Sequence, residues 1–408
     1  MALTATNQDF ADVDDRYWWQ RAKRRGDQIG IPCVFMRAGT SRGAFLREED
    51  LPRQPALREK LILAIYGSPD FRQIDGLGGA TSLTSKVAII GPPTVAGADV
   101  DYTFGQVRID EARVDFRGNC GNISAGVGPF AIDEGMVTAA AGPVTQVRIH
   151  LTNSCAILVA DVPVVDGVCP VQGEAEVAGV PGHGAPIMLD WEAVSGTLGR
   201  GLLPTGLMRE VLETAIGPVE VSIVDAGNVT AFVRPSVFGL DGEGFPTYRL
   251  DSALLAKIEA VRGAAARRLG MVEHDDQACT VTPTIPKLYM IAPACDYQDA
   301  TGRAIGARQV DLLGRGMSMG SPHAAYAGTV AVCTGAAALL EGTLVHESVR
   351  SACRGGGKIR IGHPMGVMDI EVNLDTAAGE PRLTRAAVVR TARRIMEGTV
   401  YVPIDRLV

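Results

Sequence analysis

Two segments built mainly of small apolar residues constrain the fold of this chain more than any other feature. They cover residues 122–137 and 324–340, and each follows a polar, glycine-containing turn, at 117–122 and 317–323. A helix that is apolar on every side lies in a protein interior, so we expect one buried helix in each half of the chain. A duplicated domain, with a sheet around one central helix, would explain the pattern. Two unrelated turns remain the alternative, because the segments share little sequence.

Short strand-like runs surround both segments and predict an α+β fold rather than alternating β-α-β units. Two further helices are expected, at 56–66 and 252–268. The expected strands are 31–36, 86–90, 102–109, 112–116, 145–151 and 156–164 in the first half, and 219–224, 287–292, 358–361 and 368–372 in the second. The predicted organisation is an N-terminal extension at 1–28 and two domains at 29–205 and 206–408, with the chain able to cross back near both termini.

Composition excludes several classes of function. The net charge of −7, from 39 basic and 46 acidic residues, argues against nucleic-acid binding. No run of about 18 strongly apolar residues predicts a membrane span, and aspartates near the N-terminus argue against a signal peptide. The eight cysteines show neither C-x-x-C pairs nor zinc-type spacing, so we expect reduced thiols in a cytoplasmic protein with no metal. The basic run 21–25 is expected to be a mobile arm.

The turns ahead of the two apolar helices are the first candidate functional sites. A helix N-terminus presents unpaired N–H groups and the positive end of a dipole, so two of them facing one cleft would bind carboxylates. The structural alternative is capping by Asn122 and Ser321. Cys120 lies in the first turn, where its thiol pKa would be lowered and the group could act as an acid or base. A buried, inert thiol is the alternative.

Lys86 is the second candidate. It is one of only six lysines and begins an apolar strand, where desolvation would lower its pKa and make it a general base. The alternative is a surface lysine whose stem lies along apolar residues. Thr40, Ser41 and Arg42 form a hydroxyl-rich turn with a cation that would suit a carboxylate, although on spacing alone an ordinary hairpin turn is the favoured explanation.

Familiar cofactor and nucleophile motifs are missing from the sequence. Residues 75–80 do not form a dinucleotide-binding G-x-G-x-x-G, and the chain has no Walker A, G-x-S-x-G or H-E-x-x-H motif. His363 is expected to be structural, and the glycines at 355–357 to form a hairpin turn.

Several longer motifs are recognisable. Residues 66–90, with Thr-Ser-Lys at Lys86, and residues 115–135, with Gly-Asn-Cys-Gly-Asn around Cys120, resemble the PrpF family of isomerases; so do 319–323 and 360–364. That family includes 2-methylaconitate cis–trans isomerase, 4-oxalomesaconate tautomerase and 3-methylitaconate Δ-isomerase. The resemblance implies a diaminopimelate-epimerase-like fold of two pseudo-symmetric domains, each with a curled, mostly antiparallel sheet around a central helix.

The resemblance also implies chemistry. It places Lys86 and Cys120 in a cleft between the domains and implies cofactor-independent proton shifts in di- and tricarboxylates. One departure is the turn Ala-Gly-Thr-Ser-Arg-Gly at 38–43, where the family commonly has Gly-Gly-Thr-Ser-Lys-Gly. Arg42 keeps the charge but changes the donor geometry, which would alter substrate selection.

We therefore expect an isomerase or tautomerase that shifts a proton, in a 1,3-allylic or keto–enol sense, in an unsaturated tricarboxylic acid; 4-oxalomesaconate is the preferred substrate. Lys86 would remove the proton, and Cys120 or a water would return it. The two helix N-termini would stabilise the dienolate. The expected carboxylate-holding residues are Thr40, Ser41, Arg42, Ser85 and Ser321, and the helix-start residues are Asn119, Gly121, Asn122, Gly320 and His323.

Four alternatives stay open. The substrate could be 2-methylaconitate or aconitate. An amino-acid racemase of the same fold would need two opposed cysteines, and the turn at 321–323 offers none. A non-catalytic carboxylate-binding protein, or a helper of an aconitase, would bind ligand without exchanging its protons. By analogy we also expect a homo-oligomer, with no nucleic-acid or membrane partner.

Overall fold

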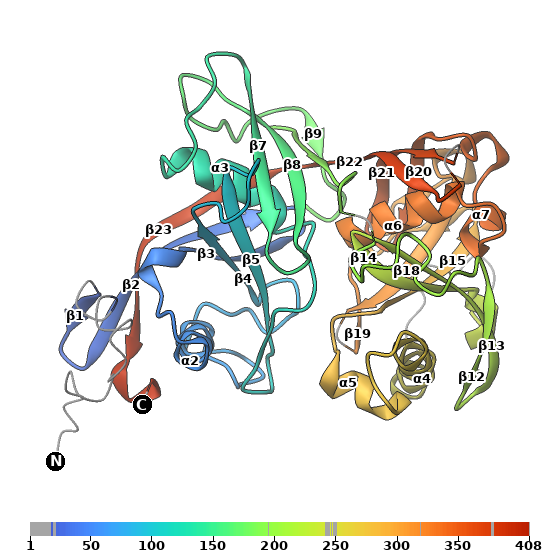
Figure 1. The fold of residues 1–408 in the computed structure, drawn as a ribbon, viewed down its shortest axis with the longest axis horizontal. Coiled ribbons are helices and arrows are strands. Elements are labelled where there is room, and N and C mark those ends of the chain that lie inside the picture. The colour runs from blue at the N-terminus through green and yellow to red at the C-terminus, as the bar shows by residue number, and fades with distance from the viewer. Residues whose placement is uncertain are drawn as a thin grey trace.

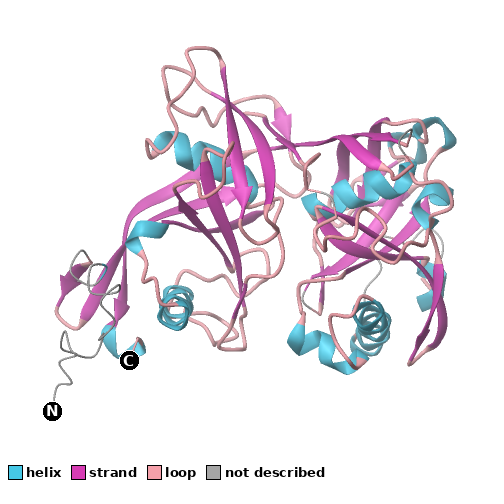
Figure 2. Ribbon diagram, viewed as in Figure 1, coloured by secondary structure: helices cyan, strands magenta, loops and turns pink. Residues whose placement is uncertain are grey.

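The computed structural model describes residues 18, 22–194, 196–240, 245, 247, 251–318, 320–376 and 379–407. Two lobes lie side by side, each with a helix enclosed by strands (Figure 1, Figure 2). Most strands join one large, mostly antiparallel sheet. Of the expected N-terminal extension, residues 1–17 and 19–21 lie outside the described part of the chain.

The first half follows the predicted order of elements. Its elements are β2 (Gln28–Ala38), β3 (Ser41–Arg47), α2 (Pro55–Tyr66), β4 (Lys86–Gly91), β5 (Val100–Val107), β6 (Val114–Asp115), α3 (Ser124–Asp133), β7 (Val144–Leu151) and β8 (Ala156–Pro163). β3 pairs in parallel with β4, β4 antiparallel with β5, β5 in parallel with β7, and β7 antiparallel with β8.

The second half repeats that scheme. Its elements are β13 (Gly217–Ala226), β14 (Asn228–Val233), α4 (Ser252–Arg268), β15 (Lys287–Pro293), β18 (Leu312–Ser318), β19 (Ser321–Pro322), α6 (Gly328–Leu339), β20 (Gly357–His363) and β21 (Gly366–Asp375). β14 pairs in parallel with β15, β15 antiparallel with β18, β18 in parallel with β20, and β20 antiparallel with β21. The two halves therefore share one pairing order, as a duplication predicts.

The remaining elements extend or connect the halves. They are β1 (Lys23–Arg25), β9 (Ala175–Glu176), β10 (His183–Gly184), β11 (Ile187–Asp190), β12 (Glu210–Thr214), β16 (Tyr297–Gln298), β17 (Ala304–Ile305), α5 (Ala278–Val281), α7 (Leu344–Ser348), β22 (Arg382–Arg390) and β23 (Ala392–Pro403). β22 pairs with β21 and β11, and β23 returns to pair with β2 from Gln28↔Pro403 to Ala38↔Ala392 (Figure 1). The last strand thus lies in the first lobe, and the division at 205/206 remains a proposal.

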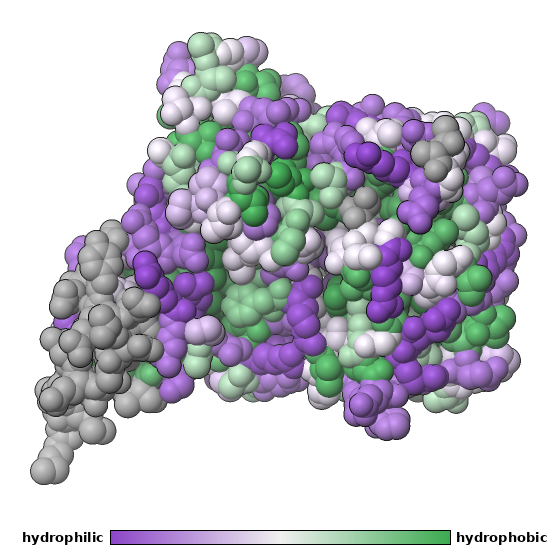
Figure 3. All heavy atoms as spheres, in the orientation of Figure 1, coloured by the Kyte–Doolittle hydropathy of each residue, from purple (hydrophilic) through white to green (hydrophobic). Residues whose placement is uncertain are grey.

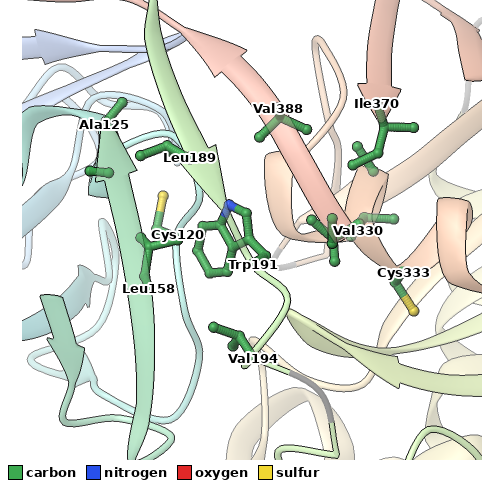
Figure 4. Packing of buried hydrophobic residues seen from close by; sticks show 14 of the residues in the cluster. Cys120, Ala125, Leu158, Leu189, Trp191, Val194, Val330, Cys333, Ile370 and Val388 are labelled. Carbon is green, nitrogen blue, oxygen red and sulfur yellow. The ribbon is translucent and has the colours of Figure 1, made fainter. Parts of the chain in front are cut away.

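The two central helices need small residues because strands pack against them closely. Residues 124–132 of α3 and 328–338 of α6 are all buried. A Cβ on Gly126 would lie 2.6 Å from the Phe45 ring, and one on Gly128 would lie 2.6 Å from Val162. Both helices belong to one hydrophobic cluster. The fully buried Trp191 lies in this cluster, with Cys120 and Leu158 on one side of it and Val330 on the other (Figure 4). This shared core holds the two helices in a fixed relation.

Two sequence-based expectations are wrong. The second apolar helix begins at Gly328 and not at residue 324, because Ser321–Pro322 turns back at Gly320 (φ +72°) and pairs with Met317–Ser318. The basic run was expected to be a mobile arm, but its described residues Lys23–Arg25 form the strand β1, which pairs with β2.

The helices expected at 56–66 and 252–268 correspond to α2 and α4.

Hydrophilic side chains cover much of the visible face of both lobes, with hydrophobic residues interspersed (Figure 3). Within the described ranges, no helix combines the length and apolar character needed to cross a membrane.

Candidate active site

Lys86 begins β4 and lies between two neighbouring strands, opposite Gly43 of β3 and Gln106 of β5. A side chain at Gly43 would overlap the Lys86 carbonyl oxygen. The lysine is 6% exposed, its Nζ donates a hydrogen bond to Gln106 Oε1, and it lies 5.2 Å from the centre of the Phe104 ring. Burial lowers the pKa of Lys86, and negative charge on Cys120 opposes that shift. Lys86 therefore has the environment of a general base.

Gln106 is held in the orientation that presents its oxygen to Lys86. Its Nε2 donates to the carbonyls of Ser85 (2.9 Å) and Ser82 (3.2 Å). A carbonyl oxygen accepts from an ammonium but cannot neutralise it as a carboxylate would. The pair thus positions Lys86 without raising its pKa in the way an ion pair does.

Cys120 lies in the turn that leads into α3 and is buried at 9% exposure. Its carbonyl accepts bonds from both the N–H (3.0 Å) and the hydroxyl (2.8 Å) of Ser124. No side chain caps α3: Asn122 instead donates to Thr40 Oγ1 (3.0 Å) and accepts from Arg390 Nε (3.3 Å). Among the described residues, the positive end of the helix therefore has no side-chain partner.

The start of α6 lies directly against this turn. A Cβ on Gly121 would lie 2.9 Å from the N atom of Thr329 and 3.1 Å from the Gly328 backbone. α6 is also uncapped, since its N-cap Ala327 has no side-chain bond. The second helix start is thus at 327–329 and not at the expected 320–323.

Asn228, the first residue of β14, joins the two helix starts. Its Oδ1 accepts from the Asn119 N–H (3.1 Å), and its Nδ2 donates to the Asn119 carbonyl (2.9 Å) and to Thr329 Oγ1 (3.0 Å). One buried side chain thereby fixes both turns relative to each other.

A cavity lies at this junction. Its lining includes Ser41, Lys86, Phe104, Gln106, Gly118, Asn119, Cys120, Gly121, Asn122, Thr284, Lys287, Tyr289, Met317, His323, Ala327, Gly328 and Thr329. Seven expected site residues are among them: Ser41, Lys86, Asn119, Cys120, Gly121, Asn122 and His323. Among the described residues, the Ser41 hydroxyl is buried and has no hydrogen-bond partner, which leaves it available to a ligand.

Five expected residues lie outside the lining of this cavity. Thr40 is next to it, bonded to Asn122. Ser85 is buried and donates to Gln73 (2.7 Å). Arg42 is exposed and lies over the Phe35 ring at 5.7 Å, on the face of β3 opposite Ser41. Gly320 and Ser321 are exposed at the tip of the β18–β19 hairpin.

The structure brings two titratable groups of the second half into the cavity. Lys287 was missed by sequence reasoning although it begins an apolar strand, as Lys86 does. Burial, and then the charge of Lys86, lowers the Lys287 pKa to about 8. His323 was expected; burial lowers its pKa to about 4, and its Nδ1 accepts from Ala325 N–H (3.1 Å). The ring is therefore neutral near pH 7.

Arg390, on β22, is a further cation close to both helix starts. It is 2% exposed; besides Asn122, it donates to the Val389 carbonyl (2.8 Å) and to Met368 Sδ (3.0 Å). Burial lowers its pKa to about 10. Across the part of the chain that the structure describes, no cluster of three or more His, Cys, Asp or Glu is arranged to hold a metal ion.

Two repeated halves with a helix from each beginning at one cavity define the epimerase-like class of folds. The chain resembles the crystal structure of a hydroxyproline epimerase from Agrobacterium vitis in fold, with 12% identity, a TM-score of 0.56, and coverage of 93% of this chain and 94% of that one. A methylitaconate-delta-isomerase structure is more similar, with 46% identity, a TM-score of 0.77, and coverage of 94% and 98%.

Within this class the chain belongs to the PrpF family: residues 28–403 match the family model described as PrpF protein. Three relatives align over almost their whole length. They are 3-methylitaconate isomerase of Eubacterium barkeri (47% identical; 94% of this chain, 100% of the relative), 2-methyl-aconitate isomerase of Shewanella oneidensis (40%; 92% and 98%) and 4-oxalomesaconate tautomerase of Pseudomonas putida (37%; 93% and 98%). The chain is an isomerase.

Proposed function

We propose that this isomerase shifts a proton along an unsaturated di- or tricarboxylic acid. The observation that carries the proposal is the cavity in which Lys86 and Cys120 lie beside two uncapped helix N-termini. A buried amine suits proton removal from carbon, and helix N-termini suit anions.

The neutral form of Lys86 would remove a proton from the carbon next to the double bond. The electron pair left behind spreads over the allyl system and its carboxylate as a dienolate. Backbone N–H groups at both helix starts would stabilise this charge, and such preorganised donors usually contribute the largest part of the rate enhancement. Cys120, at the start of α3, would contact the same anion.

Carboxylate binding would then rest on fewer residues than the sequence suggests. The unpartnered Ser41 hydroxyl, the backbone of Asn119–Asn122 and the Gly328–Thr329 turn face the cavity. We retain Thr40 as a support of Asn122 and assign no substrate contact to Arg42, Ser85, Gly320 or Ser321.

The substrate is proposed from the relatives' names. The relative with the highest of the three identities is named for 3-methylitaconate, so we place a branched unsaturated dicarboxylate of that kind first. 2-Methylaconitate and 4-oxalomesaconate, the latter preferred from the sequence, are the alternatives. The cavity chemistry is common to all three, because each carries a carboxylate conjugated to a double bond.

Proton NMR in deuterated buffer tests the proposal, since it separates exchange of substrate protons from formation of the isomer. The wild type is expected to isomerise at least one of the three acids. Lys86→Met should lower both exchange and isomerisation by about 10³-fold, and Cys120→Ser should lower both together by about tenfold. Lys60→Met on α2 and Cys155→Ser, both at exposed positions, are the matched controls.

Binding of these acids by the wild type with no proton exchange would overturn the proposal. Unchanged exchange in Lys86→Met would overturn the assignment of the base alone.

A further inference from the structure

We propose that Gln73 is a positioning residue for proton transfer by Lys86. It acts through the hydrogen bonds that orient the amide of Gln106, and it lies outside the lining of the cavity. The inference rests on the function proposed above, because it takes Lys86 as the base of that reaction.

Gln73 lies in the segment that connects α2 to β4, and its side chain is almost completely buried. The residue is 1% exposed, and its amide makes three hydrogen bonds. The Oε1 atom accepts from the Ala80 N–H (2.8 Å) and from the Ser85 hydroxyl (2.7 Å), and the Nε2 atom donates to Ser68 Oγ (2.9 Å). One side chain thus joins the chain just after α2, the middle of the connection, and the residue that precedes Lys86.

The backbone of this segment leaves room for the Gln73 side chain at a conformational cost. Gln73 has a φ of +49°, a left-handed conformation that glycine and asparagine adopt more readily than glutamine. A Cβ on Gly78 would lie 2.2 Å from Gln73 Cδ, so glycine at that position leaves space for the amide. Unfavourable backbone conformations persist where the surrounding structure fixes them, and they are concentrated at functional sites. The conformation and burial of Gln73 therefore point to a role for its amide.

The segment held by Gln73 supplies the two carbonyls that orient Gln106. The carbonyls of Ser82 and Ser85 accept from Gln106 Nε2 at 3.2 and 2.9 Å. They lie within the stretch that Gln73 holds at its two ends, since its oxygen binds residues 80 and 85. Gln73 thus reaches Gln106 through Ser85, and Gln106 in turn accepts from Lys86 Nζ.

The orientation of the Gln106 amide decides which group Lys86 meets. A glutamine amide has an acceptor oxygen and a donor NH2 group that exchange places when the amide turns over. The oxygen accepts a hydrogen bond from the ammonium that forms when Lys86 takes a proton, whereas the NH2 group would repel it. The Ser82 and Ser85 carbonyls exclude the second orientation because they require the NH2 group as their donor. By holding these carbonyls, Gln73 keeps Lys86 Nζ in one position.

The sheet offers a competing explanation. The Val107 N–H also donates to the Ser85 carbonyl (2.9 Å), so in this explanation strand pairing holds the carbonyl and Gln73 only stabilises the connection. Ser82 argues against it, because this residue lies outside β4, which begins at Lys86. Kinetic measurements distinguish the two explanations.

The experiment measures isomer formation by proton NMR with the acid that the wild type turns over. Gln73→Met keeps the length of the side chain and removes its hydrogen bonds. We expect kcat to fall by about tenfold or more and KM to change by less than about threefold, because small displacements of reacting groups have large kinetic effects. Gln106→Leu should also lower kcat.

Thr343→Ala is the matched control. Thr343 is the N-cap of α7, is buried, and bonds to the Ala337 carbonyl and the His346 N–H without lining the cavity. Its substitution should lower stability to urea, as that of Gln73 should, and leave kcat within about twofold of wild type.

A double-mutant cycle tests whether Gln73 acts through Gln106. If it does, adding Gln73→Met to Gln106→Leu should change kcat by less than about twofold, since the orientation is already lost. Losses that multiply would show that the two residues act independently, and they would overturn the inference.

The pH dependence of kcat is a second readout, which a purely structural residue does not change. A hydrogen bond to Gln106 Oε1 favours the charged form of Lys86, so losing it lowers the Lys86 pKa. The acid limb of the kcat profile should therefore move to lower pH in both single variants. The other titratable groups that act on Lys86 or respond to it are the same in both variants: Cys120, Lys287 and His323.

A wild-type kcat and pH profile in Gln73→Met would overturn the inference and leave the proposed function intact. Absence of turnover in the wild type would overturn the proposed function and, with it, this inference.

If Gln73→Met does not fold, as judged by circular dichroism, Ser85→Ala decides in its place, because it removes the hydroxyl that Gln73 accepts from. Its kcat should fall by about threefold or more with KM unchanged. A rise in KM alone would make Ser85 a substrate contact and overturn the inference.

Discussion

The two halves of the molecule share a plan but differ in what surrounds their lysines. Each half contributes a strand that begins with lysine and a buried helix that begins at the cavity. In the first half Lys86 is bonded to Gln106, and the helix start carries the thiol of Cys120. In the second half Lys287 has no bond among the described residues, and the helix start is Ala327–Gly328–Thr329. The two halves thus present similar elements to the cavity but differ in the polar contacts of those elements.

Unequal sides suit the proposed reaction. A racemase substrate presents the same carbon to two opposed groups, so two like groups serve it. A proton shift along an allyl system has two different ends, so each end needs its own environment. The predictions below test how far this asymmetry, and the contact between the halves, matter.

Among the tests of this comparison, the largest effect is expected where the helix starts touch. In Gly121→Ala the new methyl group would lie 2.9 Å from Thr329 N, and backbone atoms on both sides cannot yield without separating the turns. We expect turnover to fall by at least about 100-fold, since a 1 Å displacement of reacting groups has effects of that size. Gly142→Ala, with no atom within 4 Å, is the control. Normal turnover in Gly121→Ala would show that the contact is not needed.

Gln106→Glu tests the hydrogen bond between Lys86 and Gln106, which distinguishes the first half. It would place a carboxylate beside Lys86 and remove the donors to Ser82 and Ser85. An adjacent negative charge raises a lysine pKa by about 1–3 units, so less neutral amine is present. Turnover at pH 7.5 should fall about 10- to 100-fold and recover in part at alkaline pH. Gln298→Glu, at an exposed position, should leave the pH profile unchanged.

Asn228→Ala tests the link between the halves. It removes three hydrogen bonds and leaves the buried Asn119 groups unpaired, which should cost about 2–3 kcal/mol of unfolding free energy, measured by urea denaturation. Asn153 makes comparable bonds within the first half, to Phe104 and Phe116. Asn153→Ala should therefore lower stability with a smaller loss of turnover than Asn228→Ala; equal losses would contradict a special role at the junction.

The smallest effect is in the pH profile. The Lys287 pKa is lowered to about 8, so the cavity loses one positive charge between pH 7 and pH 9, and the KM for an anionic substrate should rise severalfold over that range. Lys86, Cys120, Asp115 and Arg262 are the charged groups that act on Lys287. In Lys287→Met the step near pH 8 should be absent. A step retained there, and lost instead in Cys120→Ser, would assign it to the thiol.

Local patterns predicted most helices and strands because they depend on near neighbours. Helices α2 and α4 follow from their apolar periodicity. The start of α6 was not predictable in this way, since pairing of Ser321–Pro322 with β18 prevails over the turn signal. Pairing between strands is a non-local property that a sequence pattern does not contain.

The sequence predicted some residues of the cavity lining and missed others, for a related reason. Lys86 and Cys120 lie in distinctive motifs, but which neighbouring side chains face the cavity depends on strand register. Ser41 and Arg42 are adjacent in sequence yet lie on opposite faces of β3. Lys287 had the same signal as Lys86, a lysine before an apolar run, but its equivalence appears only when the strands are paired.

The pairing of β23 with β2 has a consequence for how the protein is made. β2 leaves the ribosome well before its partner strand at residues 392–403. Until then the first lobe has an open edge at β2, with unpaired backbone groups that other chains could join. Synthesis of β23 therefore closes the first lobe, and truncation before residue 392 would leave that edge open permanently.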